Sequence, residues 1–216
     1  MNNTAEIFGL FPTPIMVRQY TGDLTLIINF LDLLPMVGEF SQSYGTNSQD
    51  IHVLNHKICS PLKEFILISA TNFAQQVLMY DYKEYILSIS WISHKKPGES
   101  HNQHVHPNSL ISGVFYYGDF EETTSTLKFH KQIGGINASY LFGKLSTDYQ
   151  KSQYSQDTFE FKCSPNTLIL FPSYLTHSVP INQTNKVRKS LAFNIVPKGG
   201  LGDSNNLTEL LFHKVI

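Results

Sequence analysis

The feature that most constrains the fold is a succession of short runs, from residue 84 onward, that are rich in β-branched and aromatic residues. Turn formers such as Pro97-Gly98 and Gly134-Gly135 separate these runs. Many short strands at such spacing are typical of an antiparallel barrel built from two sheets. We therefore predict strands at Tyr85–His94, Leu110–Tyr117, Thr126–Phe129, Thr158–Lys162, Thr167–Phe171 and Arg188–Val196.

Two helical patterns precede the predicted strands. Asp23 is a suitable cap for an apolar stripe that ends at Pro35, and Ser60-Pro61 opens a longer pattern. In the longer pattern apolar residues recur at helical spacing from Leu62 to Val77, which predicts a face packed on the core. We expect an edge strand at residues 15–17 and a polar loop at residues 37–50. The fold class is therefore mainly β with α, a double-stranded β-helix (jelly roll) buttressed by N-terminal helices.

The length of 216 residues predicts one domain with a sizeable core. Residues 1–83 would supply an N-terminal strand and helices, residues 84–197 the jelly-roll core, and residues 198–216 a C-terminal tail. Within the tail, residues 207–216 are apolar enough for a short helix that packs back. Residues 144–157 are rich in Ser, Gln, Tyr and Lys, so we expect a mobile polar insertion on the barrel rim.

Charge and cysteine content exclude several classes of protein. The net charge is −1, and no basic stripe indicates a nucleic-acid partner. Cys59 and Cys163 do not make a disulfide framework and fit a reducing compartment. The start lacks the regions of a signal peptide, and the most apolar run, Leu24–Met36, is too short to span a membrane. We expect a cytoplasmic protein without a membrane or nucleic-acid partner.

Three histidines are candidate metal ligands. His104 and His106 stand two residues apart near a predicted strand, and residues two apart in an extended backbone point to the same side. A third imidazole, from His177, would complete one face of a metal ion and leave other positions open for a substrate. His101 is an alternative to His104, but its odd spacing from His106 predicts that it points to the other side of the strand.

Four motifs occur in a fixed order along the chain. They are His-x-His-Pro at residues 104–107, Ser-Gly-Val-x-Tyr-Tyr at 112–117, Phe-Pro-Ser-x-x-x-His at 171–177 and Arg-x-Ser at 188–190. Together they resemble the iron(II)- and 2-oxoglutarate-dependent dioxygenases, in particular a branch common in marine bacteria and their phages. The resemblance spans about residues 84–196, with a fainter match at residues 7–14. It implies a jelly roll, Fe(II), 2-oxoglutarate and O₂, in the cytoplasm of a bacterium or a phage-infected cell.

The resemblance assigns His104 and His177 as metal ligands, and it reveals one departure from the family. The position two residues after the first histidine is usually an acid, whereas this chain has His106. A neutral imidazole can ligate Fe(II), but the site then carries one less negative charge, and three histidines also suit zinc. His106 is therefore either the third ligand or a hydrogen-bond donor that orients a neighbouring ligand.

Arg188 is the candidate cation for the far carboxylate of 2-oxoglutarate, because its planar fork matches carboxylate geometry. Ser190 and Asn194 share a strand face with Arg188 by the period of two, and Ser190 could add a hydroxyl bond to that carboxylate. The resemblance places Tyr117 at the same carboxylate, with Tyr116 facing the other way. It also places Asn194 at a recurring position of the branch, without a defined role.

The resulting expectation is an iron(II)- and 2-oxoglutarate-dependent oxygenase, a hydroxylase of a peptidyl or small-molecule substrate. Because of His106, two alternatives stay open: a three-histidine metal enzyme of the jelly-roll kind without 2-oxoglutarate, and a non-catalytic jelly-roll binding module. The residues select neither the prime substrate nor the oligomeric state.

Overall fold

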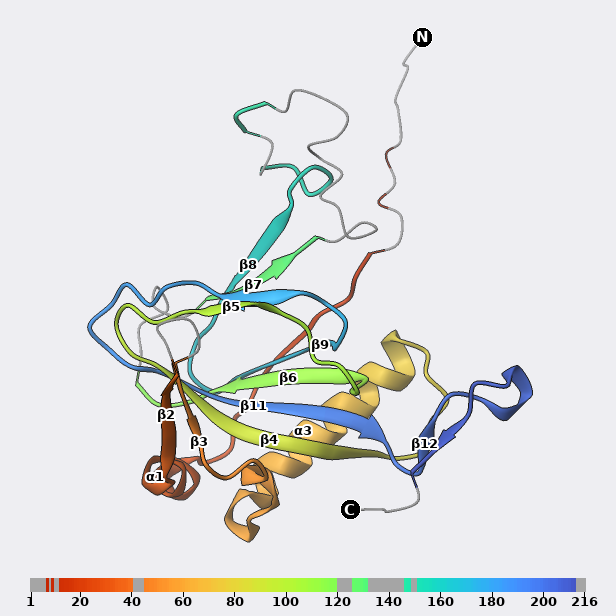
Figure 1. The fold of residues 1–216 in the computed structure, drawn as a ribbon, viewed down its shortest axis with the longest axis horizontal. Coiled ribbons are helices and arrows are strands. Elements are labelled where there is room, and N and C mark those ends of the chain that lie inside the picture. Colours follow the sequence, from red (N-terminus) through yellow and green to blue (C-terminus); the bar gives the residue numbers. More distant parts are fainter. Residues whose placement is uncertain are drawn as a thin grey trace.

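A computed structural model describes residues 7, 9, 12–40, 45–119, 126–131, 146–148 and 151–212. Two sheets dominate these residues, and every pairing between their strands is antiparallel (Figure 1). The larger sheet has the order β1-β9-β6-β11-β4-β3-β2 and the smaller one the order β5-β10-β7-β8. The larger sheet contains β1 (Met16–Gln19), β2 (Met36–Phe40), β3 (Gly45–Ser48), β4 (Tyr85–Lys95), β6 (Ile111–Tyr116), β9 (Thr167–Pro172) and β11 (Arg188–Pro197). The smaller sheet contains β5 (His101–His104), β7 (Thr126–His130), β8 (Thr158–Lys162) and β10 (His177–Val179).

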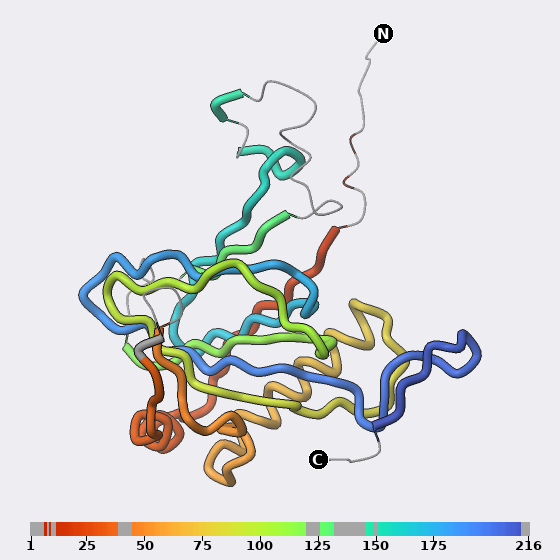
Figure 2. Tube along the Cα trace, viewed as in Figure 1, coloured from red at the N-terminus to blue at the C-terminus, as the bar shows by residue number. Residues whose placement is uncertain are grey.

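From β4 to β11 the chain passes back and forth between the two sheets, as the trace in Figure 2 shows. This winding is a double-stranded β-helix, so the predicted fold class is confirmed. All the strands predicted from residue 85 onward are present, each within one residue of its expected ends. The edge strand expected at residues 15–17 is β1, which pairs with β9 at one edge of the larger sheet.

The outer face of the larger sheet packs against α1 (Thr25–Leu33) and α3 (Ser60–Asn72). Leu31, Leu62 and Ile66 of these helices and Leu191 and Phe193 of β11 belong to one buried cluster. The sheet and helix stripes therefore bury each other, which is the main source of stability for such a layered fold. None of the helices among the described residues is both long and apolar enough to cross a membrane.

Gly113 explains one of the sequence motifs in physical terms. It lies in the middle of β6, and a Cβ atom at this position would overlap the ring of Phe193 and the side chain of Leu170. Only glycine lets the neighbouring strands β9 and β11 bring these side chains over the β6 backbone. The glycine of the Ser-Gly-Val motif is thus a packing requirement of the larger sheet.

A second buried cluster fills the interior between the two sheets. Its members include Val114 and Tyr116 of β6, Phe129 of β7 and Ile169 and Phe171 of β9. Adjacent residues of one strand, such as Phe115 and Tyr116, fall into different clusters because side chains alternate across a sheet. The interior of the barrel is therefore partly apolar, and the polar residues that share it require an explanation.

The polar loop predicted at residues 37–50 is wrong for most of its length. β2 and β3 pair with each other through Met36–Ser48 and Val37–Asn47, and β3 pairs with β4 through Thr46–His94 and Asn47–Ser93. β3 (Gly-Thr-Asn-Ser) is polar, and β2 (Met-Val-Gly-Glu-Phe) is interrupted by glycine, so neither strand shows the apolar alternation from which strands are predicted. Residues 41–44 lie outside the described residues.

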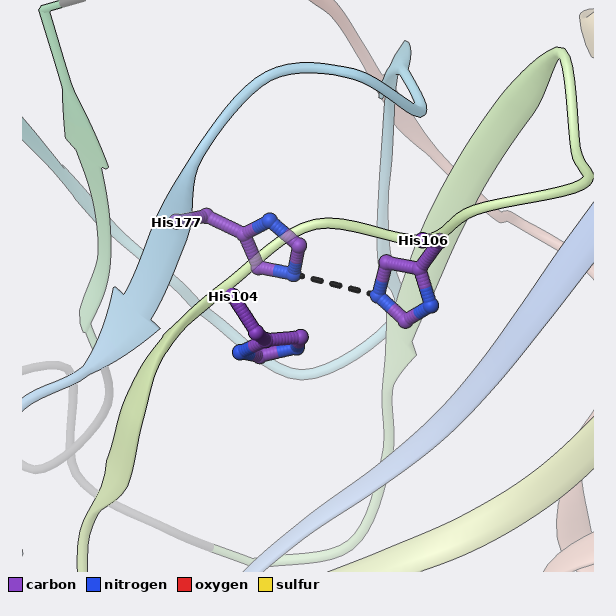
Figure 3. A group of neighbouring side chains, drawn as sticks. All are labelled: His104, His106 and His177. Carbon is purple, nitrogen blue, oxygen red and sulfur yellow. Dashed lines mark hydrogen bonds between the residues drawn. The ribbon is translucent and has the colours of Figure 1, made fainter. Parts of the chain in front are cut away.

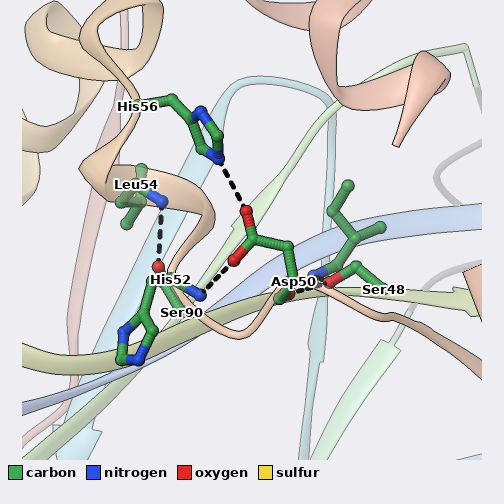
Figure 4. Close-up of polar contacts among 7 residues, drawn as sticks. Ser48, Asp50, His52, Leu54, His56 and Ser90 are labelled. Atoms are coloured by element: carbon green, nitrogen blue, oxygen red, sulfur yellow. Dashed lines mark hydrogen bonds and ion pairs between the residues drawn. The ribbon is translucent and has the colours of Figure 1, made fainter. Parts of the chain in front are cut away.

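The segment between β3 and α3 is fastened by side-chain to backbone hydrogen bonds (Figure 4). Asp50 Oδ1 accepts the backbone N–H of His52 at 2.7 Å, and Asp50 Oδ2 lies 2.6 Å from His56 Nε2. Ser90 Oγ of β4 accepts the backbone N–H of Leu54 at 2.9 Å. The two backbone bonds satisfy donors at the start of the 3₁₀ turn η1 (Val53–Asn55). The 3₁₀ turn η2 (Lys57–Cys59) follows and leads into α3.

Two further expectations fail in detail. Val77 is 47 % exposed rather than part of the core, because α3 continues as the π-helical turn η3 (Phe73–Val77), which shifts the helical period. The tail helix expected at residues 207–216 is absent from the described residues 207–212, where β13 (Leu210–Leu211) pairs with β12 (Gly200–Leu201) beyond the 3₁₀ turn η7 (Ser204–Asn206). Residues 213–216 lie outside the described residues. The expected insertion at residues 144–157 falls partly outside the described residues, which include 146–148 and 151–157.

Candidate metal centre and anion site

His104, His106 and His177 converge at one point of the barrel interior (Figure 3). His104 and His177 are directly opposite each other in the β5–β10 pair, with ring centroids 4.2 Å apart. His106 follows the end of β5, where its backbone N–H donates to Ser173 O at 3.0 Å. One ligand nitrogen from each ring lies within 4.8 Å of the others. β5, the turn that follows it and β10 therefore assemble the three side chains that the sequence predicts as ligands.

Backbone carbonyls orient two of the rings. Nδ1 of His104 lies 2.8 Å from Asn102 O, and Nδ1 of His177 lies 3.0 Å from Leu175 O. Because a carbonyl only accepts, Nδ1 carries the proton in both rings and Nε2 keeps its lone pair. His177 Nε2 lies 3.2 Å from His106 Nε2. Two ligand nitrogens bound to one metal at about 2.1 Å, with angles between square and tetrahedral, would be about 3.0–3.4 Å apart.

Burial keeps these histidines in the form that binds metals. Removal from water lowers the pKa of His106 to about 4 and that of His177 to about 3, and the neighbouring imidazoles add to the effect. Burial also lowers the pKa of His104. All three are neutral near pH 7, which is the state in which an imidazole nitrogen ligates a metal ion. The donor set thus fits a divalent transition metal.

The prediction that His101 points away from the site is wrong. Its ring stacks on that of His104, with centroids 4.1 Å apart and planes 19° apart. The register explains the difference: His104 pairs with His177 and His101 with Val179, so β5 has one extra residue between the paired positions. Such a bulge reverses the alternation of side chains, so residues three apart share a side.

A chain of hydroxyl groups supports the turn that carries His106. Ser109 Oγ donates to His106 O at 3.2 Å and to Ser173 Oγ at 2.9 Å. Ser173 Oγ lies 2.8 Å from Ser112 Oγ, which donates to Asn194 Oδ1 at 2.9 Å. Asn194, a candidate co-substrate residue, therefore lies in the network that holds the His106 turn.

Arg188 lies at the other end of the inner face of β11 and is only 2 % exposed. Its Nη2 donates to Tyr116 Oη at 2.8 Å, its Nη1 donates to Ser190 Oγ at 3.3 Å, and its guanidinium lies 4.8 Å from the centre of the Tyr116 ring. Ser190 Oγ in turn donates to Ser93 O at 3.2 Å. The fork of Arg188 is thus held in place within the barrel, as recognition of a planar carboxylate requires.

The assignment of Tyr117 rather than Tyr116 to the Arg188 side is wrong. Ser190 pairs with Tyr116 across the β11–β6 ladder, and direct cross-strand partners face the same side of a sheet. Tyr117 lies in the helix-side cluster, where its hydroxyl is 3.3 Å from His94 Nε2. Tyr116 is therefore the tyrosine that contacts Arg188. The alternation along one strand could not reveal which face is internal.

Sequence reasoning missed Lys95. This last residue of β4 pairs directly with Arg188 and has no exposed side-chain surface. Its position two residues after Ser93, at the end of a predicted strand, was the only available signal. Trp91, two residues before Ser93 on the same face, has its ring 5.9 Å from that of His106.

Solved structures share this fold. A Pseudomonas putida prolyl-4-hydroxylase superposes with a TM-score of 0.57 at 12 % identity, over 87 % of this chain and 94 % of that chain. HygX from Streptomyces hygroscopicus, solved with nickel and 2-oxoglutarate bound, gives a TM-score of 0.54 at 9 % identity, over 86 % and 83 %. The epimerase SnoN from nogalamycin biosynthesis gives 0.58 at 11 % identity, over 87 % and 80 %. At such identities the likeness defines the fold class, a jelly roll shared with 2-oxoglutarate-dependent enzymes.

The family follows from the sequence of the barrel itself. Residues 89–194 match the family described as "Putative 2OG-Fe(II) oxygenase". The segment includes the three histidines, Arg188 and Tyr116. Iron(II) and 2-oxoglutarate are the cofactor and co-substrate of the family, and the three histidines could hold the iron. No curated protein matches the chain.

Proposed function

We propose that this protein is an iron(II)- and 2-oxoglutarate-dependent hydroxylase that acts on a small-molecule or peptidyl substrate. The observation that carries this proposal is the pairing of two sites inside one barrel: three neutral imidazoles, two of them oriented by backbone carbonyls, and a buried, fixed guanidinium. A metal site alone would not need Arg188, and a plain apolar core would not contain it.

Each group has a distinct task in this proposal. His104, His106 and His177 hold the metal, and the carbonyls of Asn102 and Leu175 fix the rings of His104 and His177. When bound, iron(II) supplies the redox chemistry that couples O₂ and 2-oxoglutarate to substrate oxidation. Arg188 would bind the far carboxylate, with Tyr116 and Ser190 keeping its fork in place.

The charge of the site differs from that of a two-histidine, one-carboxylate centre. Three neutral imidazoles leave the double positive charge of the metal undiminished, whereas the usual acid would cancel part of it. A doubly charged 2-oxo acid would compensate this charge. The same feature defines the main alternative, a three-histidine enzyme that does not bind 2-oxoglutarate.

The test is the conversion of 2-oxoglutarate to succinate by anaerobically purified protein, started by adding O₂ with Fe(II) or Zn(II). We expect succinate with iron and none with zinc, and a gain of one oxygen atom in the substrate, detected by mass spectrometry. If the iron-loaded protein formed no succinate and did not bind 2-oxoglutarate, the proposal would be rejected. A product without the added oxygen would retain the oxygenase family and reject hydroxylation.

A further inference from the structure

Lys95 lies in the most protected polar part of the barrel. Along β4 it shares the inner face with Ser93, and across the ladder it faces Arg188, whereas Ser93 faces Ser190. Two rungs of the larger sheet therefore present Lys95, Arg188, Ser93 and Ser190 together, with Tyr116 next to Ser190 on β6. Each of these side chains is less than a tenth exposed, and Lys95 is fully buried.

The Lys95 ammonium has few partners for a buried charge. Its Nζ donates to Ser93 Oγ at 2.7 Å and reaches His94 O at 3.4 Å. Within the described part of the chain, no carboxylate forms an ion pair with it. A buried cation without an ion pair is costly. Burial, reinforced by Arg188 and partly offset by the Glu99 carboxylate, lowers the pKa of Lys95 to about 7.

The neighbouring hairpin is shaped around this lysine. Gly45 of β3 has a φ of +63°, and a Cβ atom there would lie 2.9 Å from Lys95 Nζ and 2.8 Å from its Cδ. The nearest atom to that Cβ would be His94 O, at 2.5 Å, so a larger residue would have to displace the β4 backbone as well as the ammonium. Next to it on β3, Asn47 pairs with Ser93, and its Oδ1 is buried without a hydrogen-bond partner. The Asn47 oxygen is therefore a polar group beside the Ser93 rung that the described side chains leave unsatisfied.

We propose that Lys95 is a second cation for the far carboxylate of 2-oxoglutarate, acting together with Arg188. This inference rests on the proposed function and names a binding residue that the family motifs do not include. A carboxylate has about four lone-pair positions, enough to accept the Arg188 fork and one ammonium donor at the same time. The bound carboxylate would supply the negative charge that Lys95 lacks in the free protein.

A purely structural lysine makes the opposite prediction. If Lys95 served only the fold, removing it would destabilise the metal-free protein, because the bond to Ser93 would be lost. If it serves an anion, Lys95→Met removes an unpaired buried charge and keeps the chain length, so the metal-free variant should melt no lower than the wild type. The two roles are therefore separable without measuring turnover.

The experiment compares two 2-oxo acids by anaerobic calorimetry of the Fe(II)-loaded protein. 2-Oxoglutarate has the far carboxylate, whereas 2-oxopentanoate has the same chelating end and a methyl group in its place. We expect Lys95→Met to weaken 2-oxoglutarate binding at least tenfold, about 1.4 kcal/mol, and to leave 2-oxopentanoate binding unchanged. Lys189→Met is the matched control, because Lys189 is adjacent to Arg188 but faces outward and pairs with Asp32.

The outcomes separate this inference from the function on which it rests. Normal 2-oxoglutarate binding by Lys95→Met would overturn the role of Lys95 while leaving the oxygenase proposal intact. An equal loss for both 2-oxo acids would also overturn it, since the damage would not concern the far carboxylate. A wild-type protein that binds neither compound in the presence of Fe(II) would reject the proposed function itself.

Discussion

At the scale of single residues, the imidazoles of His104 and His177 are oriented by carbonyls of residues two positions earlier in the chain. Such short local contacts fix both the tautomer and the direction of the free lone pair. The proposed metal centre therefore depends on side chains that are already placed before any ion binds.

We expect His104→Ala and His177→Ala each to abolish stoichiometric binding of Fe(II), because each removes one of three ligands from the face that holds the ion. Metal content after anaerobic loading and desalting measures this. His130→Ala is the control: His130 lies on β7 next to β10, and its ring bonds to Ser178 and Gln103. Full iron occupancy in both ligand variants would show that the metal site is elsewhere.

His106→Asp should keep metal binding and 2-oxoglutarate turnover within about tenfold of the wild type, roughly 1.4 kcal/mol. Aspartate is a good iron(II) ligand and restores the negative charge that the family usually has at this position. His106→Ala should lose more, because it leaves a coordination position to water. Iron occupancy and uncoupled succinate release, compared between the two variants, test this. Equal damage in both would exclude His106 as a ligand.

Arg188→Ala should weaken 2-oxoglutarate binding by well over tenfold, because losing one member of a desolvated charge pair costs about 2–5 kcal/mol. Arg188→Lys should rescue binding only in part, since a point charge cannot replace the fork. Tyr116→Phe should also weaken binding by removing the 2.8 Å bond that fixes the guanidinium. Tyr117→Phe, on the helix side, is the matched control. If binding isotherms showed that Tyr117→Phe weakens 2-oxoglutarate binding more than Tyr116→Phe does, the assignment of Tyr116 would be rejected.

At the scale of elements, the outer face of the larger sheet carries a half-buried histidine that is separate from the proposed metal centre. His94 of β4 contacts Tyr117 Oη and lies near Lys189, whose ammonium is 2.7 Å from Asp32 of α1. Burial first, and then the charge of Lys189, lowers the pKa of His94 to about 4. His94 is therefore a neutral imidazole near pH 7, beside the Lys189–Asp32 ion pair that joins β11 to α1.

This depressed pKa predicts the direction of a pH effect. The unfolded chain binds a proton at His94 below about pH 6.5, whereas the folded chain does so only near pH 4. The free energy of unfolding should therefore have its full value above pH 6.5 and fall as the pH drops toward 4. Denaturant titrations of the metal-free protein at pH 7 and pH 5 measure this. The free energy of unfolding should fall less between the two pH values in His94→Gln than in the wild type. An identical loss would mean that His94 is charged in the fold.

At the scale of the whole molecule, the two proposed binding events occur inside the same barrel and should both stabilise it. A ligand that binds only the folded state at one hundred times its Kd adds about 2.7 kcal/mol. We expect Fe(II) to raise the melting temperature of the metal-free protein and 2-oxoglutarate to raise it further. Chelation of the metal should remove most of the effect of 2-oxoglutarate, because the chelating end of the molecule then has no partner. If 2-oxoglutarate raised the melting temperature equally with and without the chelator, this coupling would be contradicted.

Much of the fold and half of the site could be predicted from local patterns. Alternation and turn formers identify every strand of the barrel from Tyr85 to Pro197 except the short β5 and β10. Short-range motifs also identify His104, His106, His177 and Arg188, because each stands at the end of a recognisable strand or turn. Local patterns succeed here because strand periodicity and turn chemistry act over a few residues.

The remaining features depend on contacts between segments that are distant in the chain. The choice between Tyr116 and Tyr117 required the register with Ser190, and the position of His101 required a bulge opposite Val179. The burial of Lys95 required both Arg188 from β11 and the β2–β3 hairpin, whose glycine-containing strands have no clear alternation to reveal them. A period of two establishes which residues share a face, but only the packing of the second sheet and the helices decides which face is internal.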